Sequence, residues 1–179
     1  ADFMMAASGG SAADFKRAAG IILASNPLGG ICGDVCPDHH CVAACSREKF
    51  DVPIQIPAVQ ATIIKKAREM GVSPEFELPP ANKGKIAIVG GGPSGIGAAV
   101  ALRQLGYEPE IFENEELGGQ AALIPGARLD RGMLMSDLMW VVECFHLKHQ
   151  KKQITEPKGL LGEVFKAVLV AGGLNEPIR

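Results

Sequence analysis

The chain has 179 residues, a formal net charge of −2 and a hydrophobic fraction of 47%. This length suits one or two small domains, and no apolar run approaches the ~20 residues that a membrane-spanning helix needs. Because the charge is nearly balanced, the sequence offers no basic surface for nucleic acid. We therefore expect a globular chain with no transmembrane segment and no nucleic-acid partner.

The first part of the chain is predicted to form two helices around a cysteine-rich segment. Residues 12–24 place apolar side chains at helical spacing. Residues 28–50 show no periodicity and are expected to form a loop. A second helix should follow, with Pro57 in its first turn and Gly71 at its end. Its apolar stripe would consist of Val59, Ile63, Ile64 and Ala67.

The remainder of the chain predicts alternating strands and helices. Residues 72–83 contain three prolines and form the expected linker between two modules. The expected elements after it are a buried parallel strand at 85–89, a turn at 90–97, a helix at 98–105, a strand at 110–113, a helix at 133–145 and a buried strand at 166–170. The polar stretch 146–153 predicts no clear element.

A glycine motif follows the first predicted strand. Gly90-Gly91-Gly92-Pro93-Ser94-Gly95 satisfies G-x-G-x-x-G, in which the glycines permit a tight turn, approach to a pyrophosphate and close helix–strand packing. Glu113 ends the second predicted strand, where an acid can accept hydrogen bonds from a ribose hydroxyl. This context predicts a dinucleotide-binding fold. The alternative is a retained fold that has lost its ligand.

Four of the five cysteines lie within residues 32–45, and they are Cys32, Cys36, Cys41 and Cys45. An odd total in a chain without a visible secretory signal argues against a disulfide framework. An iron–sulfur cluster and zinc are both candidates at this spacing, and His39 and His40 could serve zinc. Cys144 lies alone in an apolar stretch and is expected to be a small core residue.

The combined pattern resembles a known family. The run NPLGGICGDVCP at 26–37, then Cys41 and Cys45, then KIAIVGGGPSGIGAA at 85–99 resembles the N-terminal part of dihydropyrimidine dehydrogenase and the small subunit of bacterial glutamate synthase. The resemblance covers about residues 12–70 and 84–130 and returns at 165–177. In that family a helical module with two 4Fe–4S clusters adjoins an FAD domain, and electrons pass from NADPH through FAD to the clusters.

The resemblance implies a two-module α+β chain. Residues 1–71 would form an all-α iron–sulfur module similar to the α-helical ferredoxins, and residues 72–83 would be the linker. Residues 84–179 would form a partial Rossmann-like α/β domain that binds FAD and contains a parallel sheet.

The same resemblance implies roles for individual residues. Cys36, Cys41 and Gln60 would bind one 4Fe–4S cluster and Cys45 the other, whereas Cys32 would be a neighbour and less suited as a ligand. Without the resemblance, Gln60 would be interpreted as an exposed helix residue. The residues implied for FAD are Gly90, Gly92 and Gly95 at the pyrophosphate, with Pro93 and Ser94 in the same turn, Glu113 at the ribose, Gly118 and Gly119 along the flavin, and Arg128 near flavin and cluster.

The sequence also departs from the family pattern. It contains no further upstream cysteine run, although two clusters need eight protein ligands. It contains no second dinucleotide fold for NADPH, residues 131–160 match poorly, and Asp130 stands where the family usually has proline. We therefore expect other chains or missing domains to supply cluster ligands and the NADPH site.

Three functional hypotheses remain open. The first is a cytoplasmic electron-transfer flavoprotein fragment or subunit, an FAD and 4Fe–4S relay of an NAD(P)H oxidoreductase, incomplete on its own. The second is a degenerate, non-catalytic structural subunit of a larger assembly, such as a respiratory one on the mitochondrial matrix side, that keeps the fold and FAD. The third is a zinc-stabilised dinucleotide-binding module. The sequence identifies no substrate.

Overall fold

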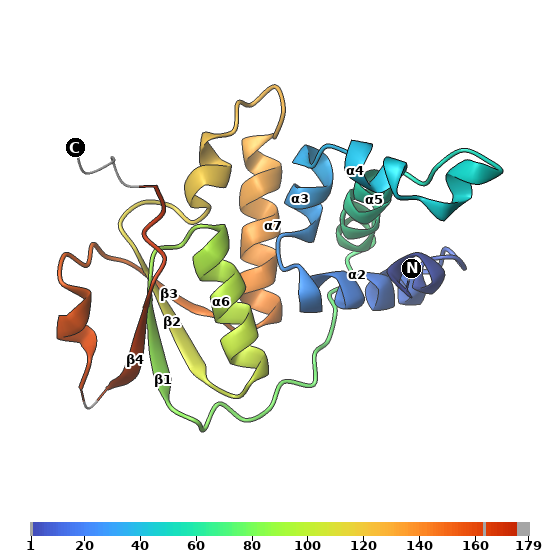
Figure 1. Ribbon diagram of the computed structural model, residues 1–179. Coiled ribbons are helices and arrows are strands. Elements are labelled where there is room, and N and C mark those ends of the chain that lie inside the picture. Colours follow the sequence, from blue (N-terminus) through green and yellow to red (C-terminus); the bar gives the residue numbers. More distant parts are fainter. Residues whose placement is uncertain (1, 163, 175–179) are drawn as a thin grey trace. The chain divides into compact units, whose positions relative to one another are not determined.

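The computed structural model describes residues 2–162 and 164–174, which divide into two compact units. The first unit runs to Glu75 and also includes Ala127–Leu129. The second comprises Phe76–Gly126 and the described residues from Asp130 onward. Figure 1 traces their elements in chain order. Residues 175–177, where the sequence resemblance ends, lie outside the described part.

The first unit is helical. Its elements are α1 (Asp2–Ala6), α2 (Ala12–Ser25), α3 (Gly29–Val35), α4 (His39–Ala43), the 3-10 helix η1 (Ser46–Lys49) and α5 (Ile56–Glu69). The two predicted helices are confirmed as α2 and α5, and Gly71 follows α5 with a φ of +65°. The prediction that residues 28–50 form a loop is wrong, because three short helical segments fall there. Segments of four to seven residues are too short to show a helical periodicity in the sequence.

Glycines let α3 pack directly on its neighbours. A Cβ added to Gly33 would lie 2.6 Å from the Pro57 carbonyl oxygen and 2.7 Å from the Ala61 nitrogen, both on α5. A Cβ on Gly29 would lie 2.3 Å from Cγ2 of Ile22 on α2. Only glycine therefore fits at these two α3 positions without a shift of the neighbouring atoms.

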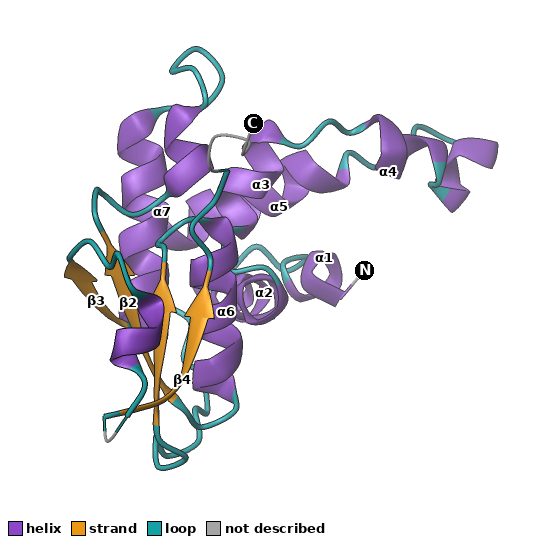
Figure 2. Ribbon diagram, turned by 60° about the vertical axis from the view of Figure 1, so that its left-hand side comes forward, coloured by secondary structure: helices purple, strands orange, loops and turns teal. Residues whose placement is uncertain are grey.

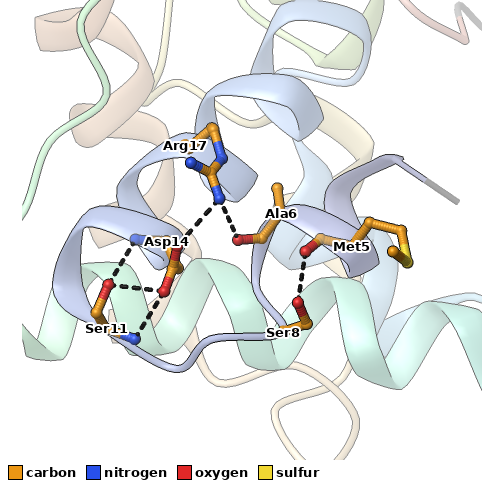
Figure 3. A network of polar contacts seen from close by, with 6 residues as sticks. All are labelled: Met5, Ala6, Ser8, Ser11, Asp14 and Arg17. Atoms are coloured by element: carbon orange, nitrogen blue, oxygen red, sulfur yellow. Dashed lines mark hydrogen bonds and ion pairs between the residues drawn. The ribbon is translucent and has the colours of Figure 1, made fainter.

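A polar network joins α1 to the start of α2 (Figure 3). The Ser11 hydroxyl accepts the Asp14 backbone N–H, and the Asp14 carboxylate accepts the Ser11 backbone N–H, which forms a capping box. Arg17 donates to this carboxylate at 3.0 Å and to the Ala6 carbonyl oxygen at 3.1 Å. The hydrogen bonds from Ser11, assisted by Arg17, lower the pKa of Asp14 below its usual value. The network thus ties the end of α1 to the first turn of α2.

The second unit contains a parallel sheet. Its elements are β1 (Lys85–Val89), α6 (Pro93–Gln104), β2 (Glu108–Glu113), the 3-10 helix η2 (Gly119–Leu123), α7 (Arg131–Cys144), β3 (Lys148–Lys151), the 3-10 helix η3 (Pro157–Leu160) and β4 (Phe165–Val170). The strands pair in the order β3-β2-β1-β4, all parallel, and Figure 2 shows them side by side. The prediction of a Rossmann-like parallel sheet is confirmed.

Two predictions for this unit were wrong in detail. Helix α6 begins at Pro93 and not at residue 98, because proline suits the first helical position and the motif glycines continue into the helix. The sequence predicts no clear element for the stretch 146–153, yet it contains β3. All four β3 side chains are exposed, so no apolar alternation marks the strand, and Lys148 and Gln150 pair with Glu108 and Glu110 of β2.

The two faces of the sheet are covered differently. Helices α6 and α7 lie on one side, and the segment that carries η3 lies on the other (Figures 1 and 2). On the η3 side, Ala87, Phe112 and Phe165 form a buried cluster, with Ile154 and Leu160 packed against it. Asp130 accepts the Met133 backbone N–H at 2.8 Å and so caps α7, which explains an acid at this position.

Within the described residues, no single helix is long and apolar enough to cross a membrane. Of the described helices, only the bent pair α2 and α3 taken together reaches the required length and apolar character, and these two meet at 84°.

We predict that Gly33→Ala destabilises the helical unit by about 1–3 kcal/mol, because its Cβ would collide with the α5 backbone. Gly20→Ala on α2 is the matched control, since its Cβ would only make an ordinary 3.6 Å contact with Pro74. Alanine is the better helix former, so the control should be neutral or more stable. Thermal unfolding followed by circular dichroism measures both, and equal melting temperatures would contradict the packing described for α3.

Candidate functional site

A cavity opens at the carboxyl edge of the parallel sheet. Its volume is about 1120 Å³, just above the usual ~300–1,000 Å³ of small-molecule sites. The lining comes from the glycine turn after β1, the ends of β2, β3 and β4, and the start of η2. In open α/β sheets this edge is where nucleotide ligands bind.

The glycine turn is shaped by backbone contacts. Gly90 has a φ of +111°, and a Cβ there would lie 2.2 Å from the Ala171 carbonyl oxygen after β4. A Cβ on Gly95 would lie 1.9 Å from the Gly90 carbonyl oxygen. Gly92 differs, because its added Cβ would meet no described atom nearer than Gly119 Cα at 3.7 Å. The missing side chain at Gly92 therefore leaves open space in the cavity.

Glu113 is held beside this turn. Its Oε2 accepts the Gly91 backbone N–H at 2.7 Å, and its Oε1 accepts the Glu115 backbone N–H at 3.1 Å. Each carboxylate oxygen has a further lone pair, so the group can still accept a hydrogen bond from a hydroxyl group of a ligand. The Gly118 N–H donates to the Gly91 carbonyl oxygen at 2.9 Å, which joins the second glycine pair to the first turn.

The structure brings most of the predicted nucleotide residues together. Those that line the cavity are Gly90, Gly92, Pro93, Ser94, Glu113 and Gly119. Gly95 is buried and packs α6 against the turn, and Gly118 lies next to the lining. Arg128 is not part of the lining; it groups with the helical unit, and its Nη2 donates to the Val35 carbonyl oxygen at 2.6 Å.

Sequence reasoning missed one wall of the cavity. Lys152, Gln153 and Ile154 after β3 belong to the lining, as do residues 171–174 after β4. A signal for the first group would have been the recognition of β3, since the carboxyl ends of parallel strands share one edge.

The four clustered cysteines occupy different local structures. Cys32 lies in α3, Cys36 caps its end, Cys41 lies in α4 and Cys45 precedes η1. Desolvation by burial raises the pKa of Cys32. Hydrogen bonds from the backbone of Ile54, then of Arg47, lower the pKa of Cys45. The backbone around Cys45 thus favours the thiolate form of its side chain.

The cysteine segment by itself does not form a complete metal site. Among the described residues, no three His, Cys, Asp or Glu side chains are grouped closely enough to hold a metal ion. Gln60 on α5 donates from Nε2 to the Gly29 carbonyl oxygen at 2.7 Å, which leaves its Oε1 as the available ligand atom. The clustered cysteines and Gln60 could supply part of an iron–sulfur ligand set. A cluster needs four protein ligands, and among the described residues they are not grouped as a complete set.

Two family models match the chain. Residues 4–72 match the model described as dihydropyrimidine dehydrogenase domain II, 4Fe-4S cluster, and residues 88–137 match the NAD(P)-binding Rossmann-like domain. The first match corresponds to the helical part, and the second runs from the end of β1 through the glycine turn, α6 and β2 into α7.

Curated relatives agree with these matches. The NAD-dependent dihydropyrimidine dehydrogenase subunit PreT of Salmonella typhimurium is 35% identical over 133 residues, which are 73% of this chain and 32% of that protein. The NADPH-Fe(3+) oxidoreductase subunit beta of Geobacter sulfurreducens is 33% identical over 69% of this chain and 19% of its own. The glutamate synthase [NADPH] small chain of Bacillus subtilis is 32% identical over 67% of this chain and 24% of its own. The chain thus spans a third or less of these relatives.

We predict that iodoacetamide modifies Cys45 faster than Cys144 at about pH 8, because the thiolate is the reactive form. Backbone hydrogen bonds lower the pKa of Cys45, whereas burial raises the pKa of Cys144 to about 11. As the pH rises, labelling of Cys45 should therefore increase first. Peptide mass spectrometry measures both rates, and unfolding in denaturant is the control that should equalise them. Equal rates in the folded protein would contradict the assigned environments.

The helical 4Fe–4S domain match, the Rossmann-like domain match and the three oxidoreductase relatives agree on one conclusion: the chain combines a 4Fe–4S domain of the dihydropyrimidine dehydrogenase type with a Rossmann-like nucleotide-binding region, and it is similar to part of NAD(P)H-dependent oxidoreductase subunits.

Proposed function

We propose that this chain is an electron-transfer part of an NAD(P)H-dependent oxidoreductase, with FAD in the cavity of the sheet unit and a 4Fe–4S cluster at the cysteine segment. The observation that carries the proposal is the open space at Gly92 beside the anchored carboxylate of Glu113. At Gly92 a pyrophosphate can approach the backbone, and the carboxylate of Glu113 can accept a hydrogen bond from a ribose hydroxyl.

FAD, when bound, would supply the capacity to accept a hydride and release single electrons. The residues of this chain would bind and orient it. The N-terminus of α6 has no side-chain cap, so its N–H groups are available to the pyrophosphate. Gly118 and Gly119, both with positive φ, would let the chain turn alongside the remaining half of the dinucleotide. The apolar walls at Leu123 and Ile154 would exclude water from its rings.

The cluster would be bound by Cys36, Cys41 and Gln60, with Cys45 directed to a second cluster. Since these are fewer than the ligands two clusters need, further ligands would come from other chains or domains. The relatives named as subunits and as a small chain support such partners. The NADPH site, the substrate and residue boundaries of 1–71, 72–83 and 84–179 for the modules belong to the same proposal.

A second candidate is a structural subunit that keeps the fold and FAD without conducting electrons. It is favoured by the absence, among the described residues, of a complete group of metal-binding side chains. The two candidates differ in the iron content of the purified protein, since only the first requires a cluster.

For the flavin site, Gly92→Val should weaken FAD binding about tenfold or more, because the new side chain would occupy the space left for the pyrophosphate. Gly97→Val is the control, since a Cβ at Gly97 in α6 would meet no described atom within 4 Å. Flavin fluorescence quenching measures the affinity of both variants. Full-affinity FAD binding by the Gly92 variant would exclude this cavity as its site.

For the cysteine segment, Cys36→Ser should reduce bound iron and lower the melting temperature, because cluster ligation contributes to folding. Cys144→Ser, which changes a half-buried thiol of α7, should leave the iron content unchanged. Iron analysis and the broad absorption of iron–sulfur clusters provide the measurement. Equal iron in both variants and the unmodified protein would refute the assignment of Cys36, and no iron in any of them would favour the structural candidate.

A further inference from the structure

The charges around the cavity pose a problem for the ligand proposed above. Two carboxylates, Glu113 and Glu115, belong to its lining. A dinucleotide adds a doubly negative pyrophosphate, so binding would bring this group close to two negatively charged carboxylates. Among the described residues of the lining, Lys152 is the one lysine or arginine.

Lys152 differs from the lysines beside it. Lys148 pairs with Glu108, and Lys151 pairs with Glu116 at 2.8 Å, so both cations are neutralised on the sheet surface. The ammonium group of Lys152 has no carboxylate partner within residues 2–162 and 164–174. A long, flexible side chain with an unpaired charge can reach an anion that arrives in the cavity.

The backbone fixes where this side chain starts. The Lys152 N–H donates to the Glu113 carbonyl oxygen at 2.7 Å, directly after the last paired residues of β2 and β3. Lys152 therefore lies beside the acid at the ribose position. The far half of the cavity is lined by residues 171–174, which follow β4 on the opposite side of β1.

We propose that Lys152 binds the phosphate on the adenosine side of the dinucleotide and offsets the negative charge of Glu113 and Glu115. This inference rests on the proposed function of the cavity and assigns it an ionic contact. Lys152 acts as a binding residue, and Glu113 accepts the neighbouring ribose hydroxyl. An ionic contact of this kind weakens as salt screens it.

The full chain provides the test, with FAD as the ligand and fluorescence quenching as the measurement. Lys152→Ala should weaken FAD binding about three- to tenfold at low ionic strength, and Lys152→Arg should retain it. The matched control is Lys151→Ala, which removes an adjacent lysine that pairs with Glu116 outside the lining. At about 1 M salt, where the Debye length is ~3 Å, the difference between Lys152→Ala and the unmodified protein should shrink.

The binding of ADP and of FMN shows which half of FAD Lys152 contacts. Since Lys152 is assigned to the adenosine side, Lys152→Ala should weaken ADP binding and leave FMN binding unchanged. Unchanged FAD affinity in Lys152→Ala, an equal loss in Lys151→Ala, or a loss with FMN alone would each overturn the inference while FAD binding itself stands. If the unmodified protein binds no FAD, the proposed function fails together with this inference.

Discussion

Backbone contacts that admit no side chain govern the sheet unit. A Cβ on Gly95 would lie only 1.9 Å from the Gly90 carbonyl oxygen, and a Cβ on Gly90 only 2.2 Å from the Ala171 carbonyl oxygen. These contacts bring the turn after β1, the start of α6 and the end of β4 together at one edge of the sheet. These close contacts fix the position of segments that line the cavity, and the absence of a side chain at Gly92 leaves space within it.

The helical unit depends on the same kind of contact. Gly33 faces the backbone of α5 and Gly29 faces Ile22 of α2, so α3 sits at the junction of the two longer helices. Through Gly29 it also accepts the amide of Gln60, the residue proposed as a cluster ligand. Close packing and the orientation of a candidate ligand therefore share one element. A side chain added at Gly29 would disturb both, because its Cβ would lie 2.3 Å from Ile22 Cγ2 and 3.6 Å from Gln60 Nε2.

In each unit, the surroundings of a few side chains determine their orientation or their protonation. In the sheet unit, backbone N–H groups hold both oxygens of Glu113, so the acid is oriented before any ligand arrives. In the helical unit, backbone hydrogen bonds favour the thiolate of Cys45, whereas burial favours the neutral thiol of Cys32. The difference is consistent with the expectation that Cys45 is the better ligand of the two. It arises from backbone hydrogen bonds at Cys45 and from burial at Cys32, neither of which the cysteine spacing specifies.

The amino-acid sequence by itself determined the resemblance to the dihydropyrimidine dehydrogenase family, the two long helices of the first unit and the glycine turn with the acid that follows β2. These features are encoded locally, by helical periodicity and by glycines at fixed spacing between a strand and a helix. Only the tertiary structure revealed α3, α4 and β3, because elements this short carry too few residues for a periodic pattern. Of these, α3 packs on α5 and β3 pairs with β2, and both partners are distant in sequence. It also placed Lys152 in the cavity and Arg128 beside Val35. The position of such a residue depends on which strand ends and loops lie next to one another, and a local sequence pattern does not predict these neighbours.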